Sequence, residues 1–280
     1  MPRIAVNGTQ LHYQIDDPVG THGPKGSVPA LQRQPVLVLA NGIFQRVEAW
    51  EPLMPYLEGF TVLRYDMRGQ GRSEVPEGAY TPELHADDLQ ALLEALNIET
   101  YHLLGLSNGG IVAQVHAARQ PEGLQRLILL CTTSRIDPLI RAKVESWQLA
   151  LEWAGTRGRL KIALPWIWGR AYLEAHPEVN SPEMLEQMFA AAPTVEAQKN
   201  LIRGFFTLTD LRPTLSRINV PTLVLSGEED LLFPPVYGEE IAQTISDSSH
   251  RMLPEVGHVA VIENTALLAR EIRDFLEVRV

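Results

Sequence analysis

Short, largely hydrophobic runs recur along the chain, and stretches with helical spacing separate them. Continuous hydrophobicity over five or six residues is typical of strands buried on both faces of a parallel sheet. Residues 82–96 differ, since their leucines fall on one side of a helix that Thr81 can cap. The runs are VLVLA (36–40), TVLRY (61–65), YHLLGL (101–106), LQRLILLC (124–131), TLVLS (222–226) and one around 250–254.

The first residues have a different pattern, in which polar and apolar positions alternate over 4–15 around an Asn7-Gly8 turn. Such alternation predicts a β-hairpin. Residues 17–34 are rich in glycine and proline and are expected to form a loop. Strands that alternate with helices predict an α/β fold with a doubly wound, mostly parallel sheet. The hairpin adds an antiparallel pair of strands at the start of this sheet.

The interval from Cys131 to Pro221 contains no convincing strand, although one crossover helix would need far fewer residues. Its pattern predicts helices over 137–153, 158–174, 182–191 and 195–209. We therefore expect an α/β core made of residues 1–134 and 213–280, with residues 135–212 inserted as a helical cap, or lid.

Aromatic residues are concentrated in this insertion, which holds four of the five tryptophans. A small helical core needs such residues, and so does a lid that lines an apolar pocket. Both interpretations apply to the same side chains. Our candidates for the pocket wall are Phe44, Trp147, Trp166 and Phe205.

Composition narrows the function classes. A net charge of −10 argues against nucleic acid as a partner, which needs a basic surface. The single cysteine, Cys131, excludes an internal disulfide and is expected to be a buried, inert thiol. No charged-then-apolar leader and no membrane-spanning run is apparent, so we expect a cytoplasmic location without a membrane partner. A trimmed export signal and the oligomeric state stay open.

The stretch LLGLSNGGIV (103–112) carries the candidate nucleophile. Gly105, Ser107 and Gly109 form Gly-x-Ser-x-Gly between a predicted strand and a predicted helix, the pattern of a nucleophile elbow. The sharp turn holds the serine hydroxyl at the end of the strand, and side chains two positions away would collide.

A serine hydroxyl needs a base, and the base needs an acid to orient it. In this architecture the order is serine, acid, histidine. Asp230, just after the 222–226 strand, is our candidate acid, with Asp137 as the alternative. His258, in the loop before the last helix, is the candidate base. The developing oxyanion needs two backbone donors, for which we choose the amides of Ile43 and Asn108.

These motifs resemble those of the α/β-hydrolase superfamily over nearly the whole chain. Asn41-Gly42 with Trp50 is similar to its His-Gly…Trp pattern, and DMRGQGRS (66–73) to its Asp-x-Arg-Gly-x-Gly-x-Ser loop. GLSNGG, GEEDLLFPP and GHVAVIEN resemble its nucleophile, acid and histidine regions. Asn41 stands where histidine is common. Together with LRYDMRGQGRS, GLSNGG and the CTTSRID stretch (131–137), it makes the chain look most like the 3-oxoadipate enol-lactonase and carboxylesterase branch, which implies a small lactone bearing a carboxylate.

The insertion offers one further hint of an anionic substrate. Residues 135–170 carry seven Lys/Arg against three Asp/Glu. This excess could attract an anion, but a solvated helix face is the favoured interpretation.

Our prediction is a serine hydrolase that cleaves carboxylic esters or lactones through an acyl-enzyme at Ser107, with Ser107, Asp230 and His258 as its triad and no metal or other cofactor. Serine at the elbow disfavours the dehalogenases and epoxide hydrolases of this fold, which use aspartate there. Carbon–carbon bond hydrolases, thioesterases and perhydrolases share the triad and stay as alternatives. A ligand-binding or signalling protein that kept the fold is the alternative outside enzymes.

Overall fold

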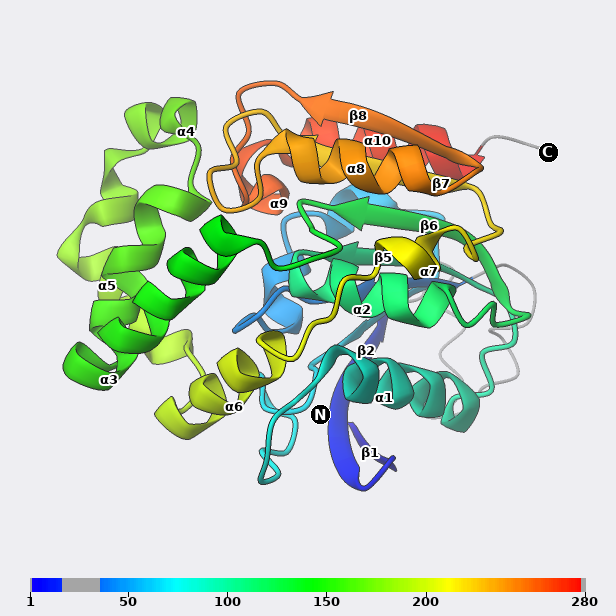
Figure 1. Ribbon diagram of the computed structural model, residues 1–280, viewed down its shortest axis with the longest axis horizontal. Helices are drawn as coiled ribbons and strands as arrows, with labels where there is room; N and C mark the ends of the chain where they lie inside the picture. Colours follow the sequence, from blue (N-terminus) through cyan, green and yellow to red (C-terminus); the bar gives the residue numbers. More distant parts are fainter. Residues whose placement is uncertain (1, 17–35, 278–280) are drawn as a thin grey trace.

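The computed structural model describes residues 2–16 and 36–277, so the predicted 17–34 loop lies outside the described residues. One eight-stranded sheet runs through the molecule in the order β1-β2-β4-β3-β5-β6-β7-β8 (Figure 1). β1 and β2 pair antiparallel at one edge, and all pairs from β4 to β8 are parallel. This confirms the predicted mixed sheet. The strands are β1 (Arg3–Val6), β2 (Thr9–Asp16), β3 (Val36–Ala40), β4 (Val62–Tyr65), β5 (Tyr101–Leu106), β6 (Leu124–Leu130), β7 (Thr222–Gly227) and β8 (Ser248–Leu253).

Successive residues of the central strands supply two separate cores, because side chains alternate between the faces of a sheet. In β3, Val36 and Val38 join one core, whereas Leu37 and Leu39 join the other. Helices α1 (Pro82–Ala95), α2 (Asn108–Ala117) and α8 (Pro235–Thr244) cover the first face. The second face is covered by α10 (Thr265–Glu277), α9 (Ala260–Glu263) and the short 3-10 helices η2 (Val47–Trp50) and η3 (Met54–Leu57). Burial on both faces explains the continuous hydrophobic runs.

The helices between β6 and β7 gather beyond one end of the sheet, at the left of Figure 1. The longest, α3, breaks at Gly155, whose φ of 63° is not helical, where the sequence predicts two helices. The predicted 158–174 helix stops earlier than expected, at Ile167. No helix of residues 2–16 and 36–277 is long and apolar enough to cross a membrane. The group consists of α3 (Pro138–Ile167), α4 (Arg170–Ala175), η4 (Pro177–Asn180), α5 (Pro182–Ala191) and α6 (Val195–Phe205), and α7 (Arg212–Leu215) leads back to the sheet.

A buried ion pair fastens the loop after β4 to α1. Arg68 Nε and Nη2 donate to the two carboxylate oxygens of Asp88, each at 2.5 Å, and Asn7 Nδ2 donates to the same carboxylate at 2.8 Å. Both members of the pair are buried. Removing one partner of a buried pair leaves the other charge uncompensated.

We expect Asp88→Ala to lower the free energy of unfolding by about 3–5 kcal/mol, because Arg68 would keep its charge without a partner. The neighbouring Asp87 pairs with Arg119 at the surface and is a matched control. Asp87→Ala should cost less than about 1 kcal/mol. Urea unfolding of the two variants measures the difference, and equal costs would contradict the assignment.

Three buried histidines make the fold sensitive to mild acid. Burial lowers the pKa of His85 to about 3 and the pKa values of His102 and His116 to about 4. In the unfolded chain a histidine has a pKa of about 6.5. Below pH 6.5 the unfolded chain therefore binds protons that the folded chain does not, and stability falls as the pH falls.

We expect the free energy of unfolding to be at its full value above pH 6.5 and to decline down to about pH 4. Each histidine contributes a slope of up to about 1.4 kcal/mol per pH unit. Urea unfolding at pH 7.5, 6.5 and 5.5 measures the total slope. His85→Leu should lower this slope by the contribution of one proton, up to about 1.4 kcal/mol per pH unit. An unchanged slope in His85→Leu would refute the account.

Candidate active site

Ser107 lies in a strained turn between β5 and α2, with φ 56° and ψ −117°. A Cβ on Gly105 would stand 2.3 Å from the Gly109 carbonyl oxygen, and a Cβ on Gly109 would stand 2.2 Å from the Ala40 carbonyl oxygen. Both distances are far below van der Waals contact, so these two positions need glycine. The collision anticipated from the Gly-x-Ser-x-Gly pattern is therefore present.

Backbone contacts fix this turn from the neighbouring strand. The Ser107 amide donates to the Leu130 carbonyl oxygen at 2.9 Å, and the Thr132 hydroxyl donates to the Ser107 carbonyl oxygen at 2.7 Å. Asn108 is the first residue of α2, where an amide has no acceptor within the helix. This amide is thus available to an anion, and the helix dipole favours negative charge there.

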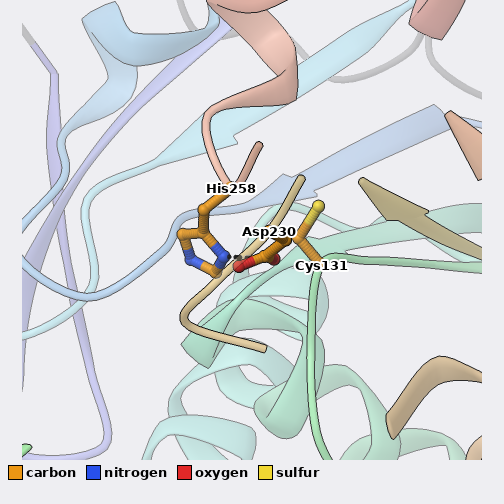
Figure 2. Close-up of side chains that lie close together, drawn as sticks. All are labelled: Cys131, Asp230 and His258. Atoms are coloured by element: carbon orange, nitrogen blue, oxygen red, sulfur yellow. Dashed lines mark hydrogen bonds and ion pairs between the residues drawn. The ribbon is translucent and has the colours of Figure 1, made fainter. Parts of the chain in front are cut away.

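Asp230 and His258 are in direct contact. His258 Nδ1 lies 2.8 Å from Asp230 Oδ2, and both side chains are buried. Figure 2 marks this contact with a dashed line. The other oxygen, Asp230 Oδ1, accepts from the amides of Leu232 at 2.8 Å and Phe233 at 2.9 Å. These two donors hold the carboxylate in a fixed orientation. The carboxylate in turn favours the imidazole tautomer with the proton on Nδ1, which leaves Nε2 free to accept a proton.

The sheet order places Ser107 at the same end of the sheet as this pair. The sheet contains β5, β6, β7 and β8 as consecutive parallel neighbours. The residues Ser107, Asp230 and His258 follow the carboxyl ends of β5, β7 and β8, which lie at the same end of the sheet. Among the described residues the serine hydroxyl has no hydrogen bond to His258. The structure therefore joins the acid and the base directly, and it brings the serine to the same edge without a direct bond.

Glu263 holds the histidine loop, which sequence reasoning missed. Its carboxylate accepts from the amides of Gly257 at 2.7 Å and Val259 at 3.0 Å, on either side of His258. The same carboxylate accepts from the amide of Gly169 at 3.1 Å, just beyond α3. The only signal in the sequence is an acid five residues after His258, and this spacing alone does not show what the acid contacts.

Cys131 lies beside this pair (Figure 2), and single atoms of Cys131, Asp230 and His258 lie within 4.8 Å of one another. Such a set has the size of a metal site. However, Asp230 Oδ2 is already bonded to His258, and burial raises the pKa of the thiol well above its ordinary value. A metal needs the thiolate and an available carboxylate. The donor set therefore fits hydrogen bonding better, and Cys131 is the buried thiol that the sequence predicted.

Asp137, the alternative acid, has a different role. Its carboxylate caps α3 by accepting from the Ile140 amide at 2.9 Å, and it accepts from the Tyr237 hydroxyl at 2.6 Å and from Arg135 at 3.4 Å. No histidine is among its hydrogen-bond partners in the described ranges. These contacts are those of a helix cap.

The loop after β3 approaches the serine. A Cβ on Gly42 would stand 3.4 Å from the Ser107 Cβ, so the backbone here is close to the candidate nucleophile. Asn41 braces the loop, since its Nδ2 donates to the Tyr65 carbonyl oxygen at 3.0 Å and its Oδ1 accepts from Trp50 Nε1 at 2.6 Å. Ile43 follows directly. The candidate donor amide thus lies one residue from the backbone that contacts Ser107.

Three of the four aromatic candidates for the pocket wall contact one another through their rings. Phe44 contacts Trp147, with ring centroids 6.4 Å apart, and Trp147 stacks on Trp166 at 6.3 Å. Phe205 belongs to the same hydrophobic cluster, but its ring contact is with Phe206. Three of the four candidates therefore form one continuous aromatic surface that begins next to Ile43.

Comparison with known proteins gives a consistent result. Residues 35–265 match the family model of the alpha/beta hydrolase fold. The 3-oxoadipate enol-lactonase 2 of Acinetobacter baylyi is 27% identical over 82% of this chain and 84% of its own length. The crystal structure of the enol-lactonase from Burkholderia xenovorans LB400 superposes with a TM-score of 0.83 at 32% identity, covering 98% of this chain and 99% of that one. A thermophilic esterase from Thermogutta terrifontis gives a TM-score of 0.82 at 27% identity, with 99% and 98% covered.

Proposed function

This chain belongs to the α/β-hydrolase family and is a hydrolase, and we propose that it cleaves carboxylic esters or lactones through an acyl-enzyme at Ser107. The observation that carries the proposal is the buried contact between His258 Nδ1 and Asp230 Oδ2, at the sheet edge where Ser107 sits in its strained turn. The enol-lactonase and esterase names of the similar proteins support the same substrate class.

Acylation begins when His258 Nε2 takes the proton of the Ser107 hydroxyl as the oxygen attacks the acyl carbonyl carbon. Asp230 holds the imidazole in the required tautomer and stabilises the imidazolium that forms. The carbonyl oxygen becomes an oxyanion, which the amides of Ile43 and Asn108 bind. His258 then gives its proton to the leaving alcohol oxygen, and the ester bond breaks.

Deacylation repeats these steps with water. His258 removes a proton from the water as its oxygen attacks the acyl carbon, and the Ser107 oxygen leaves with that proton. In a lactone the leaving hydroxyl belongs to the same molecule, so one product is released. None of these steps requires a metal or an organic cofactor.

The insertion, residues 135–212, serves in this proposal as a helical cap over a small-molecule site. Its longest helix, α3, contacts the candidate catalytic loops near both ends, since Lys143 donates to the Leu232 carbonyl oxygen at 3.3 Å and the His258 amide donates to the Ile167 carbonyl oxygen at 2.9 Å. The aromatic surface of Phe44, Trp147 and Trp166 is its apolar wall. Phe205 is the fourth proposed member of the pocket.

A graded series of p-nitrophenyl esters, from acetyl to decanoyl, tests the proposal together with matched lactones. We expect saturable hydrolysis with an optimum of chain length that measures the space under the cap. Ketone, thioester and peroxide substrates test the alternative reactions of the same triad. Ester and lactone rates that are flat, and equal to those of Ser107→Ala, would overturn the proposal.

A further inference from the structure

Lys143 connects the helical insertion to the loop that carries Asp230. It lies near the start of α3, and its Nζ donates to the carbonyl oxygen of Leu231 and, at 3.3 Å, to that of Leu232. Among residues 2–16 and 36–277, no backbone amide donates to either of these carbonyl oxygens. The ammonium group is therefore the partner of both acceptors.

The same two peptide groups contact Asp230 on their other side. A peptide group joins the carbonyl of one residue to the amide of the next, so the Leu231 carbonyl shares a group with the Leu232 amide. The Leu232 carbonyl likewise shares a group with the Phe233 amide. These two amides donate to Asp230 Oδ1 at 2.8 Å and 2.9 Å. Each peptide group thus accepts from Lys143 and donates to Asp230.

The result is a continuous chain of hydrogen bonds that ends at the candidate base. It runs from Lys143 Nζ through two peptide groups to Asp230, whose other oxygen contacts His258 Nδ1 at 2.8 Å. Hydrogen bonds in such a chain strengthen one another, because a peptide group that accepts from a cation becomes a better donor. Two donors on one oxygen limit rotation of the carboxylate, and the carboxylate orients the imidazole. A cation of the insertion is thus linked to the orientation of His258.

Lys143 differs from its neighbours on α3 in where its charge lies. Arg141, two residues earlier, is exposed and pairs with Glu145 on the same helix. Lys143 is half-buried and forms no ion pair within the described ranges. Burial lowers its pKa, whereas the charges of Asp230 and Asp137 raise it. Asp137 is already engaged as the cap of α3, so the ammonium group faces the loop of Asp230.

We propose that Lys143 is a positioning residue for catalysis, which holds the Leu231 and Leu232 carbonyl oxygens and so keeps two peptide N–H groups aimed at Asp230 Oδ1. The insertion then completes the catalytic machinery in addition to covering the site. This inference rests on the ester or lactone hydrolysis proposed above and adds to it a residue outside the triad. Lys143 acts through Asp230 and contacts neither the substrate nor the reacting atoms.

Lys143→Met tests the inference, since it keeps the apolar stem and removes the ammonium group. We expect kcat on the best p-nitrophenyl ester to fall by about tenfold, because Asp230 and His258 lose alignment. KM should change by less than about twofold. Lys143→Arg can donate to both carbonyl oxygens and should restore kcat to within a few-fold of wild type. Arg141→Met is the matched control and should leave both constants unchanged.

A double-mutant cycle with Asp230→Asn separates action through the acid from other roles. Asparagine at 230 no longer supports the base, so Lys143→Met should cause no further fall in kcat in that background. A fall of equal size in both backgrounds, or a change confined to KM, would overturn the inference.

Urea unfolding of each variant checks that the kinetic losses occur in folded protein. If Lys143→Met folds poorly, Lys143→Gln, which is polar but uncharged, takes its place with the same expectation. Wild-type kcat in the variant that folds would also overturn the inference. Wild-type hydrolysis no faster than that of Ser107→Ala would instead remove the proposed function.

Discussion

Replacing Ser107 by alanine is expected to lower kcat for ester hydrolysis by about 10⁴-fold or more, with the fold intact. The hydroxyl is the proposed attacking atom, and without it only binding and oxyanion stabilisation act on water attack. The turn itself should survive, because serine and alanine both carry a Cβ at φ 56° and bear the same backbone strain. The contacts that anchor the turn use the Ser107 backbone.

Steady-state kinetics on the best p-nitrophenyl ester, with urea unfolding alongside, checks this expectation. Ser134→Ala is the matched control, since the Ser134 hydroxyl is buried near the same strand ends and has no hydrogen-bond partner among residues 2–16 and 36–277. It should retain normal activity. More than a few per cent of activity in Ser107→Ala, after exclusion of contaminating esterases, would rule out Ser107 as the nucleophile.

The sequence predicts those parts of the fold that a short, local sequence pattern signals. The β3 and β5 runs are hydrophobic at every position because both sheet faces are covered, and α1 begins where Thr81 Oγ1 accepts from the Leu84 amide at 3.1 Å. The Gly-x-Ser-x-Gly spacing likewise fixes a turn that only glycine tolerates at two positions. In each case the pattern that signals the element lies within a few residues of it, even where the contact that requires it is distant.

Features that depend on distant contacts could not be predicted. The sequence continues a helix through Trp168 and Gly169, but the backbone there packs so tightly that a Cβ on Gly169 would stand 2.8 Å from the Gly257 amide nitrogen. Packing against the histidine loop therefore accompanies the end of α3. Glu263 is a similar case, since only the fold shows that its carboxylate binds the histidine loop.

The choice between the two candidate acids also needed the fold. Both Asp137 and Asp230 follow strands of the parallel sheet, so both satisfy the order of serine, acid and histidine. The structure separates them by partner: Asp230 contacts His258, whereas Asp137 caps α3 and accepts from Tyr237. The two aspartates therefore provide a matched pair of variants.

We expect Asp230→Asn to lower kcat by about 10³–10⁴-fold, because an amide can present its N–H to Nδ1 and favour the tautomer with the proton on Nε2. His258 could then no longer accept the proton of Ser107. Asp137→Asn should keep activity within a few-fold, since asparagine caps helices nearly as well as aspartate. Kinetics on the same ester, with unfolding measured in parallel, decides between them. If Asp137→Asn lost activity and Asp230→Asn stayed fully active, Asp137, after β6, would be the triad acid instead of Asp230. The histidine loop would then have to rearrange for His258 to reach it.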